Sequence, residues 1–183
     1  MKRQITFVGV LVVAFSMLVQ AQAPQTSKPT AEHKKLAAFI GSWSIDGEVK
    51  PGNGYGAAPG KYPHTERYQW LPGEFFLQMN REGKGPSGDF KHNLIFGYDP
   101  GTKKYSVAFF DLTGGGSMSG TGTNNGNTWM WSNNGHTADG KPFQERCTVT
   151  LVPNASYTVK CDTSPDGKTW SPSFEGKATR SKP

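Results

Sequence analysis

The strongest constraint on the fold is an alternation of apolar and polar side chains that recurs along the chain. It is clearest over residues 43–50, WSIDGEVK, where every second position is apolar or glycine. Successive side chains of a β-strand point to opposite faces, so this pattern is typical of a strand with one buried face. Similar segments, separated by Gly, Pro, Asn and Asp turns, predict about ten strands. They lie at about residues 43–49, 65–70, 75–82, 91–98, 104–111, 117–123, 128–132, 143–151, 156–163 and 170–179.

Short strands that follow one another without helices between them indicate an antiparallel sandwich or a closed up-and-down barrel. The composition agrees, because 23 Gly and 13 Pro in 183 residues exclude a helical bundle or a coiled coil. An aromatic content of 12% is too high for a disordered chain. No internal repeat is visible, so we expect one domain over residues 32–180, followed by a short tail at 181–183.

One short helix is predicted ahead of the strands, from Ala31 to Ile40. Thr30 can cap its first turn, and Gly41 can end it. Leu36 and Phe39 fall on one side of such a helix, which gives it an apolar face to pack against the strands.

The N-terminus has the pattern of a secretory signal peptide. Lys2 and Arg3 precede an uncharged apolar run, Ile5–Val19, which is short for a membrane span and typical of the hydrophobic region of a signal. Small residues favour cleavage after Ala21, which leaves a polar, flexible leader at 22–31. An uncleaved N-terminal anchor is the alternative. We therefore expect an exported protein, periplasmic or secreted, with no membrane span after cleavage.

The formal net charge of +6 comes from scattered lysines and arginines rather than from a basic tract. The densest spots are the pairs Lys34-Lys35 and Lys103-Lys104, which are too short to follow a phosphate backbone. We therefore expect no nucleic-acid partner. The histidines, cysteines and carboxylates also lack the short spacings of a metal site, so no metal is expected.

The two cysteines, Cys147 and Cys161, flank a predicted hairpin whose turn lies at 152–156. If Val149 lies opposite Val159, the same register sets the cysteines opposite each other on one apolar face. Directly opposed residues of a non-hydrogen-bonded pair are within reach of a disulfide. An even number of cysteines in an exported chain favours this bond, and two buried free thiols are the alternative.

The connections between the strands alternate in length. Tight turns rich in Gly, Pro and Asn alternate with longer connections at 51–63, 83–90, 112–116 and 133–142. Alternate loops of an up-and-down barrel lie at the same end. One end is therefore expected to be sealed by short turns, while the other is a mouth where a ligand can enter.

Several short motifs are distinctive in their order and spacing. They are GSW at 41–43, HTERYQWLPGEFFL at 64–77, GYDP at 97–100, NTW at 127–129, SPDGKTW at 164–170 and GKA at 176–178. Together they resemble the DUF1579 family of uncharacterised bacterial proteins, over nearly the whole chain after the predicted signal. The resemblance implies an all-β fold, an antiparallel up-and-down β-barrel of about ten strands, calycin-like, of the lipocalin or nitrobindin type. It implies no activity, because none is established for the family.

The resemblance also raises the question of haem. Nitrobindins share the Gly-x-Trp opening and bind haem through a histidine of the barrel. None of the four histidines of this chain can be matched to that ligand by motif. We therefore expect no cofactor, with haem as the alternative that the resemblance leaves open.

The predicted hairpins also place polar side chains on the apolar faces of their strands. A tight Pro-Gly turn that pairs Trp70 with Phe75 would set Glu66 opposite Met79. All four would then share one face of the sheet. A slip of one residue would move them to the other face.

The next hairpin extends this polar group. If Tyr98 faces Tyr105, His92 lies opposite Asp111. We then expect five polar side chains to face inward near the mouth, beneath an aromatic lining. This predicted polar ring consists of His64, Glu66, Arg81, His92 and Asp111.

A few polar groups on an apolar wall are typical of ligand pockets, so we expect a small apolar or amphipathic molecule to bind in the barrel without catalysis. An alternative is that the polar ring pairs only with itself and with water. Two other functions stay open: an enzyme in which Asp111 orients His92 as a general base, and an envelope interaction protein with a filled barrel. The residues expected to line the ligand site are Trp43, Glu66, Tyr68, Trp70, Phe75, Arg81, His92, Phe96, Tyr98, Phe109 and Asp111.

Overall fold

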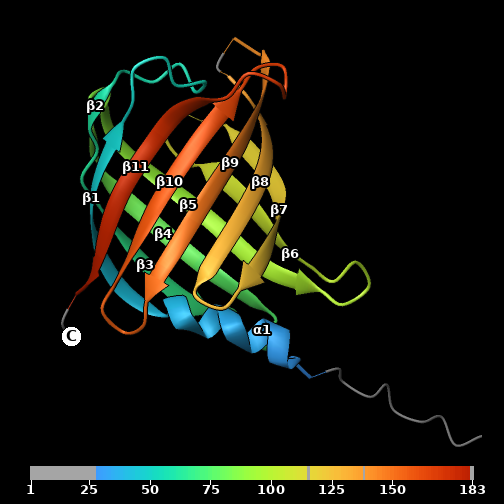
Figure 1. Cartoon of the computed structure of the whole chain (residues 1–183). Coiled ribbons are helices and arrows are strands. Elements are labelled where there is room, and N and C mark those ends of the chain that lie inside the picture. The colour runs from blue at the N-terminus through green and yellow to red at the C-terminus, as the bar shows by residue number, and fades with distance from the viewer. Residues whose placement is uncertain (1–27, 115, 138, 182–183) are drawn as a thin grey trace, which may run out of the picture.

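The computed structural model describes residues 28–114, 116–137 and 139–181. Figure 1 shows them as one β-barrel with a short helix beneath it. Successive long strands pair antiparallel, and β11 pairs back with β1, which closes a barrel of 10 strands. The strands are β1 (Gly41–Val49), β2 (Gly60–Lys61), β3 (His64–Trp70), β4 (Phe76–Gly85), β5 (Gly88–Asp99), β6 (Lys104–Asp111), β7 (Ser117–Asn125), β8 (Thr128–His136), β9 (Pro142–Val152), β10 (Ser156–Ser164) and β11 (Ser171–Arg180).

The closure confirms the predicted barrel and excludes the sandwich. Seven residue pairs join β1 to β11, from Trp43 opposite Arg180 to Val49 opposite Phe174. Because no sheet edge is left between these two strands, alternate residues of each strand point either into the barrel or outward. The short β2 adds to the mouth end of β1.

Two connections that the sequence predicts as long loops are shorter, because the flanking strands extend into them. β4 and β5 continue until Gly85 pairs with Gly88, so the segment 83–90 is a tight hairpin. β8 and β9 likewise extend into the segment 133–142, which leaves 137–141 between them. These segments are polar and contain glycine, so they lack the apolar alternation that predicts a strand. Their backbones still pair, because the register of the neighbouring residues brings them opposite each other.

A helix covers the end of the barrel that has the short turns (Figure 1). α1 (Ala31–Lys35) begins at the predicted residue and continues as a 3-10 turn, η1 (Leu36–Phe39), which ends one residue earlier than predicted. Leu36 is fully buried, and the carbonyl oxygen of Phe39 accepts a 2.7 Å hydrogen bond from Nε1 of Trp43. The apolar face of the helix therefore forms the floor of the barrel.

Aromatic side chains fill the half of the barrel above this floor. Trp129 and Trp131 stack with ring centroids 6.1 Å apart, and the ring of Tyr105 packs against Trp129 at 4.7 Å. Phe39 of η1 contacts the same group from below, at 5.4 Å from Trp129. This packed half fixes the strands whose other ends carry the candidate site.

The predicted hairpin of β9 and β10 is confirmed in its register. Val149 lies opposite Val159, and Cys147 lies opposite Cys161. The two sulfur atoms form a disulfide with an S–S distance of 2.05 Å. The alternative of two free thiols is therefore wrong for the cysteines of the described chain.

In the described part of the chain, no helix is both long enough and apolar enough to cross a membrane. The predicted signal peptide, its cleavage site after Ala21 and the leader up to residue 27 lie outside the described residues.

Candidate functional site

The barrel holds a cavity of about 500 Å³, which extends from the mouth down to Phe39 of η1. It lies under the connection between β1 and β3, because Tyr55, Ala57 and Tyr62 form part of its wall. Ligand pockets of proteins usually have volumes of roughly 300–1,000 Å³, so this cavity has room for a small molecule. Most of its wall is apolar and includes Met79, Leu94, Phe96, Val107, Phe109 and Val159.

A buried carboxylate, Glu66 on β3, is the centre of the polar groups in the barrel. Its side chain is 3% exposed. Oε1 accepts a hydrogen bond from Nε of Arg81 at 3.0 Å. It also lies 2.8 Å from Nη2 of Arg81, in an ion pair, and 3.2 Å from Nε2 of His64. Oε2 accepts hydrogen bonds from the hydroxyl of Tyr68 at 2.9 Å and from that of Tyr157. A carboxylate has about four lone-pair positions, so Glu66 is saturated by its own protein.

The electrostatics of this cluster keep Glu66 ionised. Burial alone would raise the pKa of Glu66, but the charge of Arg81 and the contact with His64 outweigh it and lower the pKa to about 2. Burial and the Glu66 charge together raise the pKa values of Tyr68 and Tyr157 well above the ordinary value. The cluster is therefore an internal ion pair with neutral hydroxyl donors at neutral pH.

His92 on β5 and Asp111 on β6 lie nearer the mouth. They are opposite each other, as predicted, but Nε2 of His92 is 4.0 Å from Oδ1 of Asp111, which is longer than a hydrogen bond. The imidazole packs between the rings of Phe90 and Phe109, at centroid distances of 4.9 Å and 4.8 Å. Burial and then the charge of Arg81 lower the pKa of His92 to about 4, against the opposite effect of Asp111. His92 is therefore a neutral imidazole at neutral pH.

Asp111 is engaged with its own loop. Its Oδ1 accepts hydrogen bonds from the backbone N–H groups of Thr113 at 2.8 Å and Gly114 at 3.0 Å, and from the Thr113 hydroxyl at 2.6 Å. Burial alone would raise the pKa of Asp111, but these hydrogen bonds outweigh it and lower the pKa. Asp111 thus shapes the turn after β6 and keeps a negative charge at the mouth.

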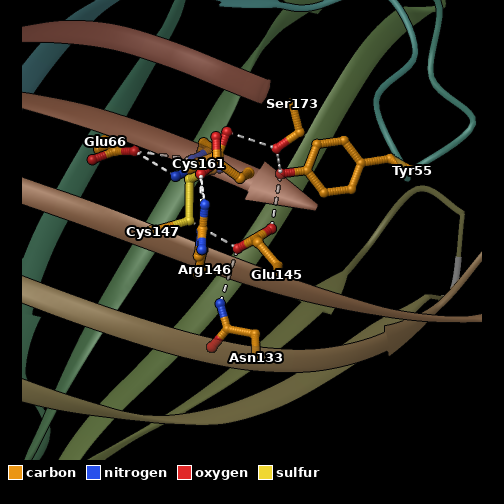
Figure 2. Close-up of a disulfide and its surroundings, with 10 residues drawn as sticks. Tyr55, Glu66, Asn133, Glu145, Arg146, Cys147, Cys161 and Ser173 are labelled. Carbon is orange, nitrogen blue, oxygen red and sulfur yellow. Dashed lines mark hydrogen bonds and ion pairs between the residues drawn. A yellow bond between two sulfur atoms is a disulfide. The ribbon is translucent and has the colours of Figure 1, made fainter. Parts of the chain in front are cut away.

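A second buried carboxylate, Glu145 on β9, lies beside the disulfide. Figure 2 shows it between Tyr55, which reaches in from the loop after β1, and Asn133 of β8. The Tyr55 hydroxyl donates to Oε2 at 2.8 Å, and Nδ2 of Asn133 donates to Oε1 at 2.9 Å. Oε1 also lies 2.9 Å from the sulfur of Cys147, while the Tyr55 oxygen is 3.0 Å from Oγ of Ser173. Burial raises the pKa of Glu145, and the two hydrogen bonds oppose this rise only in part.

Comparison with known proteins identifies the family of this barrel. The chain matches, over residues 28–180, a family described as "Protein of unknown function (DUF1579)". The chain belongs to the DUF1579 family. The resemblance seen in the sequence motifs is therefore confirmed, and no curated protein matches the chain.

The barrel of this DUF1579 protein is also similar to solved structures. The crystal structure of Rv2717c from M. tuberculosis aligns with 84% of this chain and 99% of its own, at a TM-score of 0.62 and 13% identity. At that identity the likeness concerns the fold alone. A de novo designed fluorescence-activating β-barrel aligns with 79% of this chain and 95% of its own, at 13% identity and a TM-score of 0.42.

Within the DUF1579 barrel, the structure brings most of the predicted site residues to the cavity. Glu66, Tyr68, Arg81, His92, Phe96, Phe109 and Asp111 line it. Trp43, Trp70 and Tyr98 do not. Trp43 is fully buried, and Trp70 and Tyr98 pack against the same helix-covered core. Phe75 lies at that end too, with its ring 5.3 Å from the imidazole of His33 in α1.

The predicted register between β3 and β4 is wrong by two residues. Trp70 pairs with Leu77 rather than with Phe75, and Glu66 pairs with Arg81 rather than with Met79. A shift of two keeps every side chain on the same face, so the residues still point inward. It changes their partners, and it brings Arg81 directly across from Glu66.

Sequence reasoning missed Glu145 and Tyr55. A signal for Glu145 was present, because it continues the inward alternation of Cys147 and Val149 along β9. Tyr55 had none, since it lies in an irregular connection where periodicity carries no information.

Two further questions about this DUF1579 site concern a metal and haem. Glu145, Cys147 and Cys161 are the one cluster of metal-ligand type within the described ranges, and the disulfide occupies both sulfurs. For haem, both ring nitrogens of His64 face acceptors, on Tyr62 and on Glu66. His92 lines the cavity as a neutral imidazole, so it is the enclosed side chain that could coordinate a haem iron.

Proposed function

We propose that this protein binds a small, partly apolar molecule inside its barrel and does not transform it. The observation that carries the proposal is the cavity of about 500 Å³, whose wall is mostly apolar and whose polar groups are few and fixed. Side chains pack the barrel beside the helix, but they leave this cavity between the floor and the mouth. An envelope protein that used its loops alone would have no use for such a cavity.

The polar groups favour binding over catalysis. Glu66 has no free position for a substrate proton, because its own neighbours occupy its oxygens. His92 lacks the hydrogen bond to Asp111 that would orient it as a general base. The enzyme alternative therefore gains no support from the arrangement of these side chains.

A variant that fills the cavity tests this proposal. Val159 on β10 lines the cavity, so its replacement by phenylalanine places a ring where the ligand would lie. We expect Val159→Phe to weaken binding of the neutral fluorescent probe N-phenyl-1-naphthylamine at least tenfold, measured by fluorescence titration. The neighbouring Thr158 is exposed on the outer face, and Thr158→Phe should leave the affinity within about twofold.

The result that contradicts the proposal is equal probe binding by Val159→Phe and the unchanged protein, with the fold of both checked by circular dichroism. Failure of the unchanged protein to bind the probe at all would also count against a cavity open to apolar molecules.

We further infer that the protein is exported. The charged start, the apolar run Ile5–Val19 and the disulfide in the barrel wall all suit an oxidising compartment outside the cytoplasm. Protein expressed in a bacterium and recovered from the periplasm is expected to begin at Gln22 and to have both cysteines oxidised. Intact mass spectrometry with and without alkylation measures both. A cytoplasmic product that retains Met1 would contradict the inference.

A further inference from the structure

The charges on the cavity wall do not balance. Within the described residues, Arg81 is the one lysine or arginine that lines the cavity, whereas Glu66, Asp111 and Glu145 contribute carboxylates. Arg81 is held by Glu66 through one hydrogen bond from Nε and an ion-pair contact from Nη2, both to Oε1. Two histidines also line the cavity. His92 adds no charge at neutral pH, because its pKa is lowered to about 4, and His136 is exposed to solvent at the end of β8.

Glu145 is the carboxylate that this imbalance leaves without a cation. It is 6% exposed, and buried carboxylates in proteins are usually paired with a positive charge. Its neighbours are the hydroxyl of Tyr55, the amide of Asn133 and the disulfide sulfur of Cys147, and none of them is charged. Two donors occupy two of about four lone-pair positions, so the carboxylate has room for further donors.

Glu66 is paired with a cation and Glu145 is not, and this difference determines which ligand charge the cavity favours. A ligand carboxylate, sulfate or phosphate could still reach the N–H groups that Arg81 leaves free, but the charge of this guanidinium is already balanced by Glu66. It would also approach Glu145 and Asp111 and be repelled by both. A ligand cation meets the opposite situation, because Asp111 at the mouth attracts it and Glu145 lies inside.

We propose that the ligand is an amphipathic organic cation, such as a primary amine on an alkyl chain, whose ammonium group pairs with Glu145 while its chain lies along the apolar wall. This inference rests on the proposed ligand-binding function and names the class of ligand for it. An ammonium group supplies three donors, which can reach the free positions on the Glu145 oxygens. The chain then contacts side chains such as Leu94, Val107 and Val159.

Three molecules with the same eight-carbon chain test the charge preference. Octylamine, octanol and octanoate are each titrated against protein loaded with N-phenyl-1-naphthylamine, and the loss of probe fluorescence is measured at pH 7. We expect octylamine to bind at least tenfold more tightly than octanol, and octanoate to bind most weakly. Octanol acts as the reference, because its displacement of the probe depends on the apolar cavity alone.

The variant Glu145→Gln assigns the preference to one side chain. It is expected to weaken octylamine binding about tenfold while octanol binding stays within twofold, because glutamine keeps the shape and loses the charge. Glu82→Gln is the matched control: Glu82 is an exposed carboxylate on β4, with a side chain 64% exposed, and its removal should change neither affinity.

A pH titration of the unchanged protein gives a second test that needs no variant. The groups facing Glu145 are Tyr55 from the loop, Asn133 from β8, Thr163 from β10 and, as the one cationic side chain acting on it, Arg81. Of the carboxylates lining the cavity, Glu145 has the raised pKa and is protonated first as the pH falls. Octylamine affinity should therefore fall between pH 7 and pH 4, and octanol affinity should not.

The outcomes separate this inference from the function on which it rests. If octanol displaces the probe and octylamine binds no better, the cation preference is wrong and ligand binding stands. Tighter binding of octanoate than of octylamine, or an unchanged preference in Glu145→Gln, also overturns it. If the unchanged protein binds neither the naphthyl probe nor octanol, the proposed function itself fails.

Discussion

Replacing Glu66 by glutamine is expected to lower the free energy of unfolding by about 3 kcal/mol, because it leaves the Arg81 guanidinium inside the barrel without its counter-charge. Glu66 is 3% exposed, and the Arg81 side chain is 23% exposed, toward the cavity that it lines. Glutamine fills the same space but offers one acceptor oxygen where two oxygens now receive Arg81, Tyr68 and Tyr157. Urea denaturation at pH 7, followed by tryptophan fluorescence, measures the loss.

The pH dependence of this loss identifies its electrostatic origin. Folding lowers the pKa of Glu66 from its ordinary value of 4.5 to about 2, which corresponds to about 3 kcal/mol. Because the pKa is lower in the folded state, this stabilisation is complete above pH 4.5 and is lost as the pH falls toward 2. The difference in unfolding free energy between the unchanged protein and Glu66→Gln should therefore be largest above pH 5 and shrink at acid pH. A difference that did not vary with pH would indicate a packing effect instead.

Two controls accompany the Glu66 variant. Glu82→Gln removes an exposed carboxylate that is 3.5 Å from Lys91, and it should cost less than about 1 kcal/mol. Adding Arg81→Met to Glu66→Gln should cost less than the sum of the single changes, because the unpaired guanidinium is gone. Strictly additive losses would mean that the two side chains act independently.

The inward faces of the strands could be predicted from the sequence, whereas some of their pairings could not. The hairpin of β9 and β10 has the predicted register, because its apolar face and its opposed cysteines allow a single alignment. The Pro-Gly turn after Trp70 was predicted to be shorter than it is. The chain there makes a wider turn, in which the backbone N–H of Leu71 donates to the carbonyl of Phe76 and Glu74 has a φ of 57°. A pattern of apolar and polar residues does not reveal that a glutamate adopts the left-handed backbone conformation. This wider turn shifts the β3–β4 register by two residues.

Part of the candidate site could likewise be predicted from the sequence, and part could not. The polar ring could be predicted because its members interrupt apolar strand faces, and the structure places four of the five, Glu66, Arg81, His92 and Asp111, on the cavity wall. The fifth, His64, is buried against Tyr62 and Glu66 and does not line the cavity. Its internal pairing could not be predicted, because saturation of Glu66 depends on Tyr157, which arrives from β10 across the barrel. The residues of the closed end could not be assigned without the helix either. Trp43 on β1 points inward, and its hydrogen bond to the carbonyl of Phe39 in η1 shows that it packs on the floor rather than on the cavity wall.

Replacement of Trp43 by alanine is expected to cost about 3–5 kcal/mol of unfolding free energy. The indole is fully buried, donates Nε1–H to the carbonyl of Phe39 at 2.7 Å, and packs 5.0 Å from the ring of Tyr157. The guanidinium of Arg180 lies 4.2 Å from its centroid, so the indole also links β1 to β11 where the barrel closes. Alanine leaves a cavity at this junction, and urea denaturation measures the cost.

The same variant decides between two roles of Trp43, since sequence reasoning placed it on the ligand wall and the structure places it on the floor. If the floor role holds, folded Trp43→Ala binds N-phenyl-1-naphthylamine within about twofold of the unchanged protein, although it unfolds at much lower urea. Trp170→Ala is the matched control, because this indole is partly exposed beside Arg146 at 4.4 Å and its loss should cost about 1 kcal/mol or less. A tenfold loss of probe affinity with little loss of stability would return Trp43 to the ligand wall, because a floor residue outside the cavity supports the fold without touching the probe.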